Sequence, residues 1–284
     1  MSEASMEVKF QAADGQVLSG RHFPPRQPRG AVLLCGATGV RQRFYGHFAQ
    51  WLTARGYAVL TFDYRGLGDS LQQVHVRHSP ARKQDWGELD MPAALDWLEG
   101  QYPRQPLHLI GHSAGGQLIG LMHNHRKLTS VVQVASSSGY VGNIRMPLRF
   151  AARVLLSVYI PATARLLGYV PTKYMGWGED LPAEVAGQWA RWCLRPGYVA
   201  NAFGRDVHRH YYDEFSTPIL SIIAADDPIA TVANVTDLLR LFPAAPVRRV
   251  TIEPRQWGRK AVGHIDIFRP SSMELWPVIA EGLQ

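Results

Sequence analysis

Short apolar runs recur along most of the chain, and segments with helix-like spacing of apolar residues separate them. The runs have the length of strands and are largely apolar at consecutive positions, which predicts strands buried on both faces of a sheet; they cover residues 31–36, 57–64, 106–113, 129–137, 217–226 and 246–254. Ahead of them, residues 6–25 alternate apolar and polar side chains around Asp14-Gly15, a pattern typical of a β-hairpin. The pattern predicts an α/β protein with a mostly parallel central sheet and helices on both faces.

The alternation of strand and helix stops between residues 139 and 211. This stretch is aromatic and helix-like, and it contains no strand-like run between turn signals. The alternation resumes with the apolar run at 217–226. We therefore predict an α/β core formed by residues 1–138 and 212–284, with a helical cap segment inserted at residues 139–211.

Two helices of the core can be placed in more detail. Asp90, with Pro92 in the following turn, is expected to cap a helix that ends near Gly100. Residues 114–124 are expected to form a helix directly after the apolar run 106–113.

Composition and charge exclude several classes of protein. Of 284 residues, 46% are hydrophobic and 19% are charged, which favours a globular chain over a disordered one. The net charge of +7 is scattered and lacks an aromatic and basic RNA-binding pattern, so we predict no nucleic-acid partner. Cys35 and Cys193 are too few for a disulfide framework or a zinc cluster, which predicts a reducing, cytoplasmic compartment and no metal site.

The pattern of apolar residues also bears on membranes. The first residues lack the basic and apolar regions of a signal peptide, and the longest strongly apolar stretch without charge, residues 154–164, is far shorter than the roughly 20 residues of a spanning helix. We predict no integral membrane segment. Apolar residues interrupted by arginines at 146–167 leave peripheral lipid contact through the cap segment open, and the oligomeric state is not predicted.

The sequence Gly111-His112-Ser113-Ala114-Gly115 lies directly between a strand-like run and a helix-like segment. In that position GxSxG is typical of a nucleophile elbow, a turn so sharp that the residues two before and two after the serine must be small. Ser113 is therefore the predicted nucleophile. The backbone N–H of Ala114 is a predicted donor to the oxyanion that forms in acyl transfer.

A nucleophilic serine needs a base and a group that orients the base. The base should come from a loop beyond the last strand, and His264 is the only histidine after residue 210. Asp226 and Asp227 stand at the end of an apolar run, where the orienting acid is expected. Because neighbouring residues at a strand end point to opposite sides, only one of them can face His264.

The loop Gly36-Ala37-Thr38-Gly39 follows the first long apolar run. Its glycines allow a close approach of the backbone, and we predict the N–H of Ala37 as the second oxyanion donor. The loop lacks the GxGxxG pattern of dinucleotide-binding proteins, so no cofactor is predicted.

These motifs together resemble those of α/β-hydrolase serine hydrolases over nearly the whole chain. The closest resemblance is to bacterial predicted hydrolases related to monoacylglycerol lipases and serine aminopeptidases. The segments that carry it are, in family order, DGQVLSGRHFPP, LLCGATG, FDYRGLGDS, GHSAGG, AADDPIA and GHIDIFRP. The chain departs from the family at Cys35-Gly36, where relatives commonly have His-Gly, so a role of that histidine side chain is lost here.

The resemblance implies an α/β-hydrolase fold with a catalytic triad of Ser113, Asp227 and His264, and with Ala37 and Ala114 as oxyanion donors. Asp227 is favoured over Asp226 because the family spacing, an acid followed by any residue and an apolar one, fits Asp227 better.

The resemblance also implies a serine hydrolase that cleaves a carboxylic ester, or a related acyl bond, of a small molecule through an acyl-serine intermediate. Two alternatives remain at this point. An acyltransferase would use the same triad with an acceptor other than water. A non-catalytic hydrolase fold would bind a ligand and usually lacks a triad member, whereas the sequence supplies all three.

Overall fold

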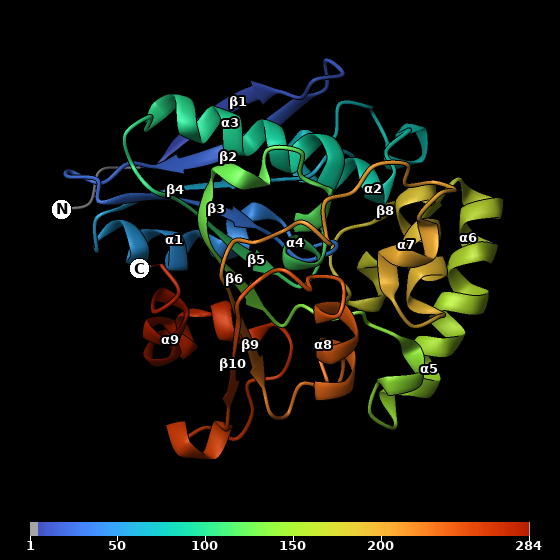
Figure 1. Cartoon of the computed structure of the whole chain (residues 1–284). Coiled ribbons are helices and arrows are strands. Elements are labelled where there is room, and N and C mark those ends of the chain that lie inside the picture. The colour runs from blue at the N-terminus through green and yellow to red at the C-terminus, as the bar shows by residue number, and fades with distance from the viewer. Residues whose placement is uncertain (1–4, 284) are drawn as a thin grey trace.

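The structure is a computed structural model that describes residues 5–283, and an eight-stranded sheet runs through its centre (Figure 1). The strand order is β1–β2–β4–β3–β5–β6–β9–β10. The first hairpin, β1–β2, and the β2–β4 pair are antiparallel, and the remaining pairs are parallel. The mostly parallel sheet predicted from the apolar runs is thus confirmed. Its strands are β1 (Met6–Gln11), β2 (Val17–Phe23), β3 (Gly30–Cys35), β4 (Tyr57–Phe62), β5 (Leu107–His112), β6 (Leu128–Val134), β9 (Ile219–Ala224) and β10 (Val247–Ile252).

Helices cover both faces of this sheet, because its central strands are apolar on both sides. Every residue of β3, β4, β5 and β9 is buried. One apolar cluster joins the sheet to α1 and α9, and other clusters join its opposite face to α3 and α8. The α-helices are, in chain order, α1 (Gly46–Thr53), α2 (Lys83–Asp85), α3 (Met91–Gln101), α4 (Ala114–Gln117), α5 (Leu148–Val154), α6 (Ile160–Leu167), α7 (Ala183–Cys193), α8 (Val232–Leu239) and α9 (Trp276–Ala280).

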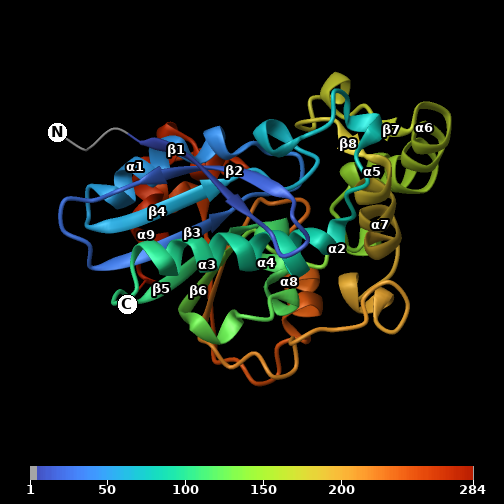
Figure 2. The ribbon, with the colours of Figure 1, turned by 90° about the horizontal axis from the view of Figure 1, so that it is seen from above.

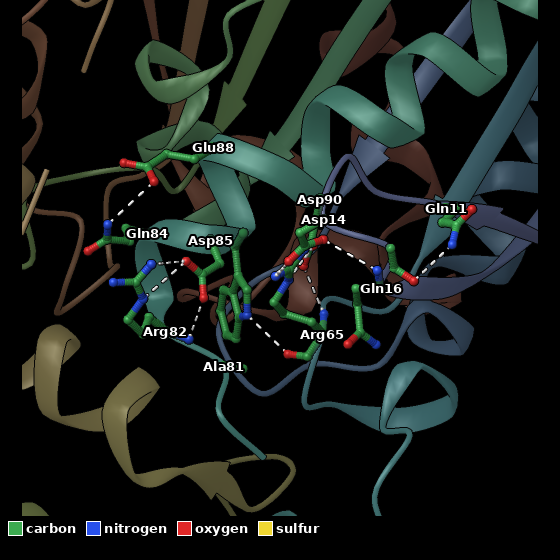
Figure 3. A network of polar contacts seen from close by, with 12 residues as sticks. Gln11, Asp14, Gln16, Arg65, Ala81, Arg82, Gln84, Asp85, Glu88 and Asp90 are labelled. Atoms are coloured by element: carbon green, nitrogen blue, oxygen red, sulfur yellow. Dashed lines mark hydrogen bonds and ion pairs between the residues drawn. The ribbon is translucent and has the colours of Figure 1, made fainter. Parts of the chain in front are cut away.

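The helix predicted between Asp90 and Gly100 is present as α3, but the predicted cap by the Asp90 side chain is wrong. A π-helical segment, Trp86–Asp90, joins α2 directly to α3, and the Asp90 side chain caps neither. Its fully buried carboxylate instead accepts hydrogen bonds from Nε of Arg65 at 2.6 Å and from the Arg65 backbone N–H at 2.9 Å. Arg65 also binds Asp14 of the first hairpin (Figure 3). A buried carboxylate requires a cationic or N–H partner, and this requirement determines where Asp90 points.

The helix expected at residues 114–124 is shorter than predicted. Only α4 is α-helical, and a 3₁₀ turn follows at Ile119–Leu121. The carbonyl of Gln117 accepts a hydrogen bond from the Tyr212 hydroxyl at 2.7 Å, and the carbonyl of Gly120 accepts one from the Tyr211 N–H at 2.7 Å. These carbonyl groups would accept the next hydrogen bonds of a longer helix. They are instead occupied by residues about 90 positions further along the chain.

Figures 1 and 2 place α5, α6 and α7 of the cap segment beyond one end of the sheet. The segment is mainly helical, as expected, but the prediction that it contains no strand is wrong. Two-residue strands, β7 (Tyr169–Val170) and β8 (Leu181–Pro182), form a small antiparallel pair. Strands this short produce no alternating pattern that a sequence can display. The boundaries of the cap segment stay a prediction.

The helical stretch Leu148–Leu167 in the cap segment has an exposed apolar face. Phe150, Val154 and Val158, four residues apart, are 70%, 44% and 59% exposed. The stretch has 20 residues and a mean hydropathy of 1.4, and it is long and apolar enough by length and composition to cross a membrane. The sequence-based estimate gave a shorter apolar stretch because charged residues such as Arg153 interrupt it. The absence of a membrane-spanning segment therefore stays a prediction.

Candidate active site

Ser113 lies in a sharp turn between β5 and α4. Its backbone has φ 48° and ψ −106°, a combination that costs energy for a residue with a side chain. A Cβ atom at Gly111 would collide with the backbone of Gly116, and one at Gly115 would collide with the carbonyl of Cys35. Glycine at these two positions is what allows the chain to turn here.

Three residues predicted from the sequence lie within hydrogen-bond distance in series. His264 Nε2 lies 3.1 Å from Ser113 Oγ, and His264 Nδ1 lies 2.7 Å from Asp227 Oδ2. The other carboxylate oxygen of Asp227 accepts hydrogen bonds from the N–H groups of Ile229 and Ala230, both at 2.8 Å. Burial alone would raise the pKa of Asp227, but His264 and these N–H groups outweigh burial and hold it below its ordinary value. Asp227 is therefore ionised at neutral pH and accepts the Nδ1–H, which leaves Nε2 as the acceptor facing Ser113.

Asp226 has a different place. Its carboxylate accepts hydrogen bonds from the backbone N–H groups of Val262 at 2.9 Å and Gly263 at 3.1 Å. These residues immediately precede His264. Asp226 thus anchors the loop that carries His264, while Asp227 contacts the imidazole ring itself.

His112, next to the serine, is fully buried and links two loops of the site. Its Nε2–H donates to the backbone carbonyl of His264 at 2.9 Å, so its Nδ1 accepts from the Tyr45 hydroxyl at 2.8 Å. Burial lowers the pKa of His112 to about 3, which keeps it neutral. The Tyr45 hydroxyl also accepts the backbone N–H of Ala37 at 2.9 Å. No pattern in the sequence indicates this bridge through Tyr45.

The two N–H groups predicted to bind the oxyanion differ in whether another group already occupies them. The N–H of Ala37 is engaged by Tyr45. The N–H of Ala114, at the first position of α4, makes no hydrogen bond to any residue between 5 and 283. Ala37 and Ala114 both stay predictions as oxyanion donors, and a substrate oxygen at Ala37 has to share its N–H with the Tyr45 hydroxyl.

A cavity of about 600 Å³ opens beside Ser113 and His264. The core contributes polar and small residues to it, and the cap segment contributes an apolar wall formed by Ile144, Leu148, Ala152, Leu155, Leu156 and Trp189. Arginines also line it, among them Arg41, which pairs with Glu179 at 3.1 Å. Within residues 5–283, no group of three or more His, Cys, Asp or Glu side chains is placed to hold a metal ion.

A buried lysine behind this cavity was missed in the sequence. Lys83 on α2 is fully buried, and its Nζ donates to Thr38 Oγ1 at 2.7 Å and lies 4.5 Å from the centre of the Trp86 ring. No carboxylate of the described chain lies within 4 Å of Nζ. Burial lowers the pKa of Lys83 from its ordinary 10.5 to about 7.

This lysine predicts a specific pH dependence of stability. Between pH 7 and 10.5 the unfolded chain holds a proton on Lys83 that the folded chain has released, so stability rises with pH across this window. From pH 7 to 9.5 the contribution reaches about 3 kcal/mol. Urea unfolding at both pH values should show the rise in the wild type and lose it in Lys83→Met. An equal rise in both proteins would contradict the assignment.

The mostly parallel sheet, the sharp turn at Ser113 after β5, and the contact between Asp227 and His264 on later loops are typical of the α/β-hydrolase class. The family model described as "Serine aminopeptidase, S33" matches residues 26–254, and the chain belongs to this family of hydrolases. The matched span includes Ser113 and Asp227 and ends before His264.

Individual relatives agree with this class. The chain is 22% identical to the quorum-quenching protein AidA of Acinetobacter baumannii over 255 residues, 80% of each protein. It is 34% identical to a monoacylglycerol lipase of Mycolicibacterium smegmatis over 97 residues, which span 34% of this chain and 33% of the lipase. Among solved structures, a Pyrococcus furiosus esterase has a TM-score of 0.64 at 18% identity, covering 99% of this chain and 90% of the esterase. At this identity the likeness shows the fold alone.

Proposed function

We propose that the protein is a serine hydrolase that cleaves a carboxylic ester through an acyl-Ser113 intermediate. The observation that carries the proposal is the hydrogen-bonded series from Asp227 through His264 to Ser113, which ends at a cavity with an apolar wall. A serine activated in this way is the arrangement that acyl transfer requires.

In the proposed reaction, His264 Nε2 takes the proton of Ser113 as Oγ bonds to the ester carbonyl carbon. The carbonyl oxygen gains negative charge, which the N–H groups of Ala114 and Ala37 are proposed to stabilise. The intermediate then collapses, the bond to the alcohol oxygen breaks, and the alcohol leaves with the proton from His264. Water attacks the acyl-serine by the same steps and releases the acid and the free serine.

Asp227 stabilises the imidazolium that forms during each half of the reaction. It remains a carboxylate throughout, because its pKa lies below its ordinary value. His112 stays neutral beside this charge, and its hydrogen bond to the His264 carbonyl keeps the base in place.

The cavity predicts a preference for short to medium acyl chains. Its volume of about 600 Å³ is bounded in part by side chains of α5 and of the π-helical segment Leu155–Tyr159 after it, so a long chain has to leave through the opening. A series of nitrophenyl esters should give the highest kcat/KM at short to medium length, with little turnover of triglyceride emulsions. A maximum at long chains, with activation above the solubility limit of the substrate, would contradict this prediction.

The same ester assay tests the function itself. Wild type should release nitrophenol with saturation kinetics, and Ser113→Ala should not. Adding an alcohol acceptor distinguishes the acyltransferase alternative, since a transferase forms a new ester at the expense of the free acid. A protein that binds a ligand tightly but neither hydrolyses the ester nor transfers its acyl group to the alcohol would instead favour the non-catalytic binding module.

A further inference from the structure

Thr38 contacts the buried amine of Lys83 and lines the same cavity as Ser113. Its Oγ1 accepts the hydrogen bond from Lys83 Nζ, and Thr38 is itself a lining residue of that cavity. Lys83 Nζ is the donor in this contact, so the contact does not use the hydroxyl proton of Thr38. No acceptor among residues 5–283 takes that proton, which leaves it available to a bound molecule.

The backbone on either side of Thr38 is already engaged in hydrogen bonds, which makes the free hydroxyl proton of Thr38 an available donor of this loop. Thr38 directly follows Ala37, whose N–H already donates to the Tyr45 hydroxyl at 2.9 Å. The next residue, Gly39, is held from the cap segment, because its carbonyl accepts the N–H of Glu179 at 2.7 Å. The loop after β3 is thus held in place on both sides of Thr38. Its backbone donor toward the cavity, the N–H of Ala37, is already shared with the Tyr45 hydroxyl.

We propose that the Thr38 hydroxyl donates a hydrogen bond to the substrate oxygen that becomes negative when Ser113 attacks, and that Lys83 is the positioning residue that directs this hydroxyl. The inference rests on the function proposed above. Thr38 keeps its proton, and no bond to it forms or breaks. The Thr38 hydroxyl is thus a side-chain donor to the substrate oxygen, in addition to the backbone N–H of Ala114.

The placement of Lys83 supports this role. An ammonium buried without a carboxylate partner destabilises the fold, and a methionine of similar length would avoid that cost. The direct hydrogen bond from Lys83 goes to Thr38, which lines the cavity. An N–H that donates to a hydroxyl also strengthens that hydroxyl as a donor, because hydrogen bonds in series polarise one another.

The test measures ester turnover and the rate at which a fluorophosphonate modifies Ser113, since both reactions build negative charge on an oxygen at the same place. Thr38→Val removes the hydroxyl at nearly constant shape and should lower kcat by about 100-fold with KM changed less than about threefold. Thr38→Ser should restore kcat to within about fivefold of wild type.

Lys83→Met should lower kcat by about tenfold while raising stability at pH 7, a combination that loss of folding does not produce. The double variant should be no slower than Thr38→Val, because Lys83 acts through Thr38. Lys127→Met is the matched control, since Lys127 pairs with Asp96 and Glu99 on the surface and should keep kcat within about twofold.

The outcomes separate this inference from the function on which it rests. Wild type that reacts with the fluorophosphonate while Thr38→Val reacts equally fast would overturn the role of Thr38 alone. A further slowing of Thr38→Val by Lys83→Met would overturn the positioning role of Lys83. Wild type that neither reacts with the probe nor turns over esters would contradict the proposed function, and this inference with it.

Discussion

Ser113→Ala and His264→Ala should each lower kcat by about 10⁴- to 10⁶-fold, and the double variant should be little slower than either single one. The reason is that the two side chains perform one proton transfer, across the 3.1 Å between Oγ and Nε2. Once either is gone, the other has nothing to act on. Single-turnover and steady-state kinetics on one soluble ester measure all three variants.

His208→Ala provides the matched control, because His208 lies in the chain segment leading to Tyr211 and is not a lining residue of the cavity. It should keep kcat within about twofold of wild type. Losses for Ser113→Ala and His264→Ala that multiply in the double variant would show that the two residues act separately, against the proposed mechanism.

Asp227→Asn should lower kcat by about 10⁴-fold with the fold intact. An asparagine at this position can no longer hold the Nδ1–H tautomer of His264 or stabilise its imidazolium. The change also weakens the acceptor for the N–H groups of Ile229 and Ala230, so circular dichroism and a melting curve should accompany the kinetics.

Asp226→Asn is the comparison at the neighbouring residue and should lower kcat far less than Asp227→Asn. An asparagine keeps one oxygen acceptor for the N–H groups of Val262 and Gly263, so the loop that carries His264 shifts without losing its base. We expect a decrease of about tenfold or less, together with a lower melting temperature. The reverse order of the two effects would make Asp226 the acid.

Much of this arrangement is predictable because its residues are constrained locally. The strands β3, β4, β5 and β9 are buried on both faces, so their apolar runs need no tertiary information to be recognised. The elbow around Ser113 depends on glycines at two fixed positions, which the sequence displays directly. Between Asp226 and Asp227 the residues themselves did not decide, and only the resemblance to the family spacing favoured Asp227. In the structure Asp227 is the one that contacts His264.

The remaining features depend on contacts between distant segments. α4 ends early because Tyr211 and Tyr212 use its carbonyl groups and those of the following turn. Asp90 faces Arg65 instead of capping a helix, since it is buried in the folded chain. Lys83 looks like an ordinary surface lysine in the sequence, and only the packing of the core around it reveals that its side chain is buried.

The proposed acyl-enzyme chemistry requires that Ser113 be the one unusually nucleophilic serine of the chain. A fluorophosphonate probe tests this directly, because Ser113 Oγ displaces fluoride from phosphorus while His264 accepts the serine proton. Intact-mass measurement and peptide mapping of the wild-type protein should show one added phosphonyl group, located on the peptide that contains Ser113. Ser113→Ala and His264→Ala should remain unlabelled over the same time. Labelling of Ser113→Ala at the wild-type rate, or a native wild-type protein that takes up no probe, would contradict the account.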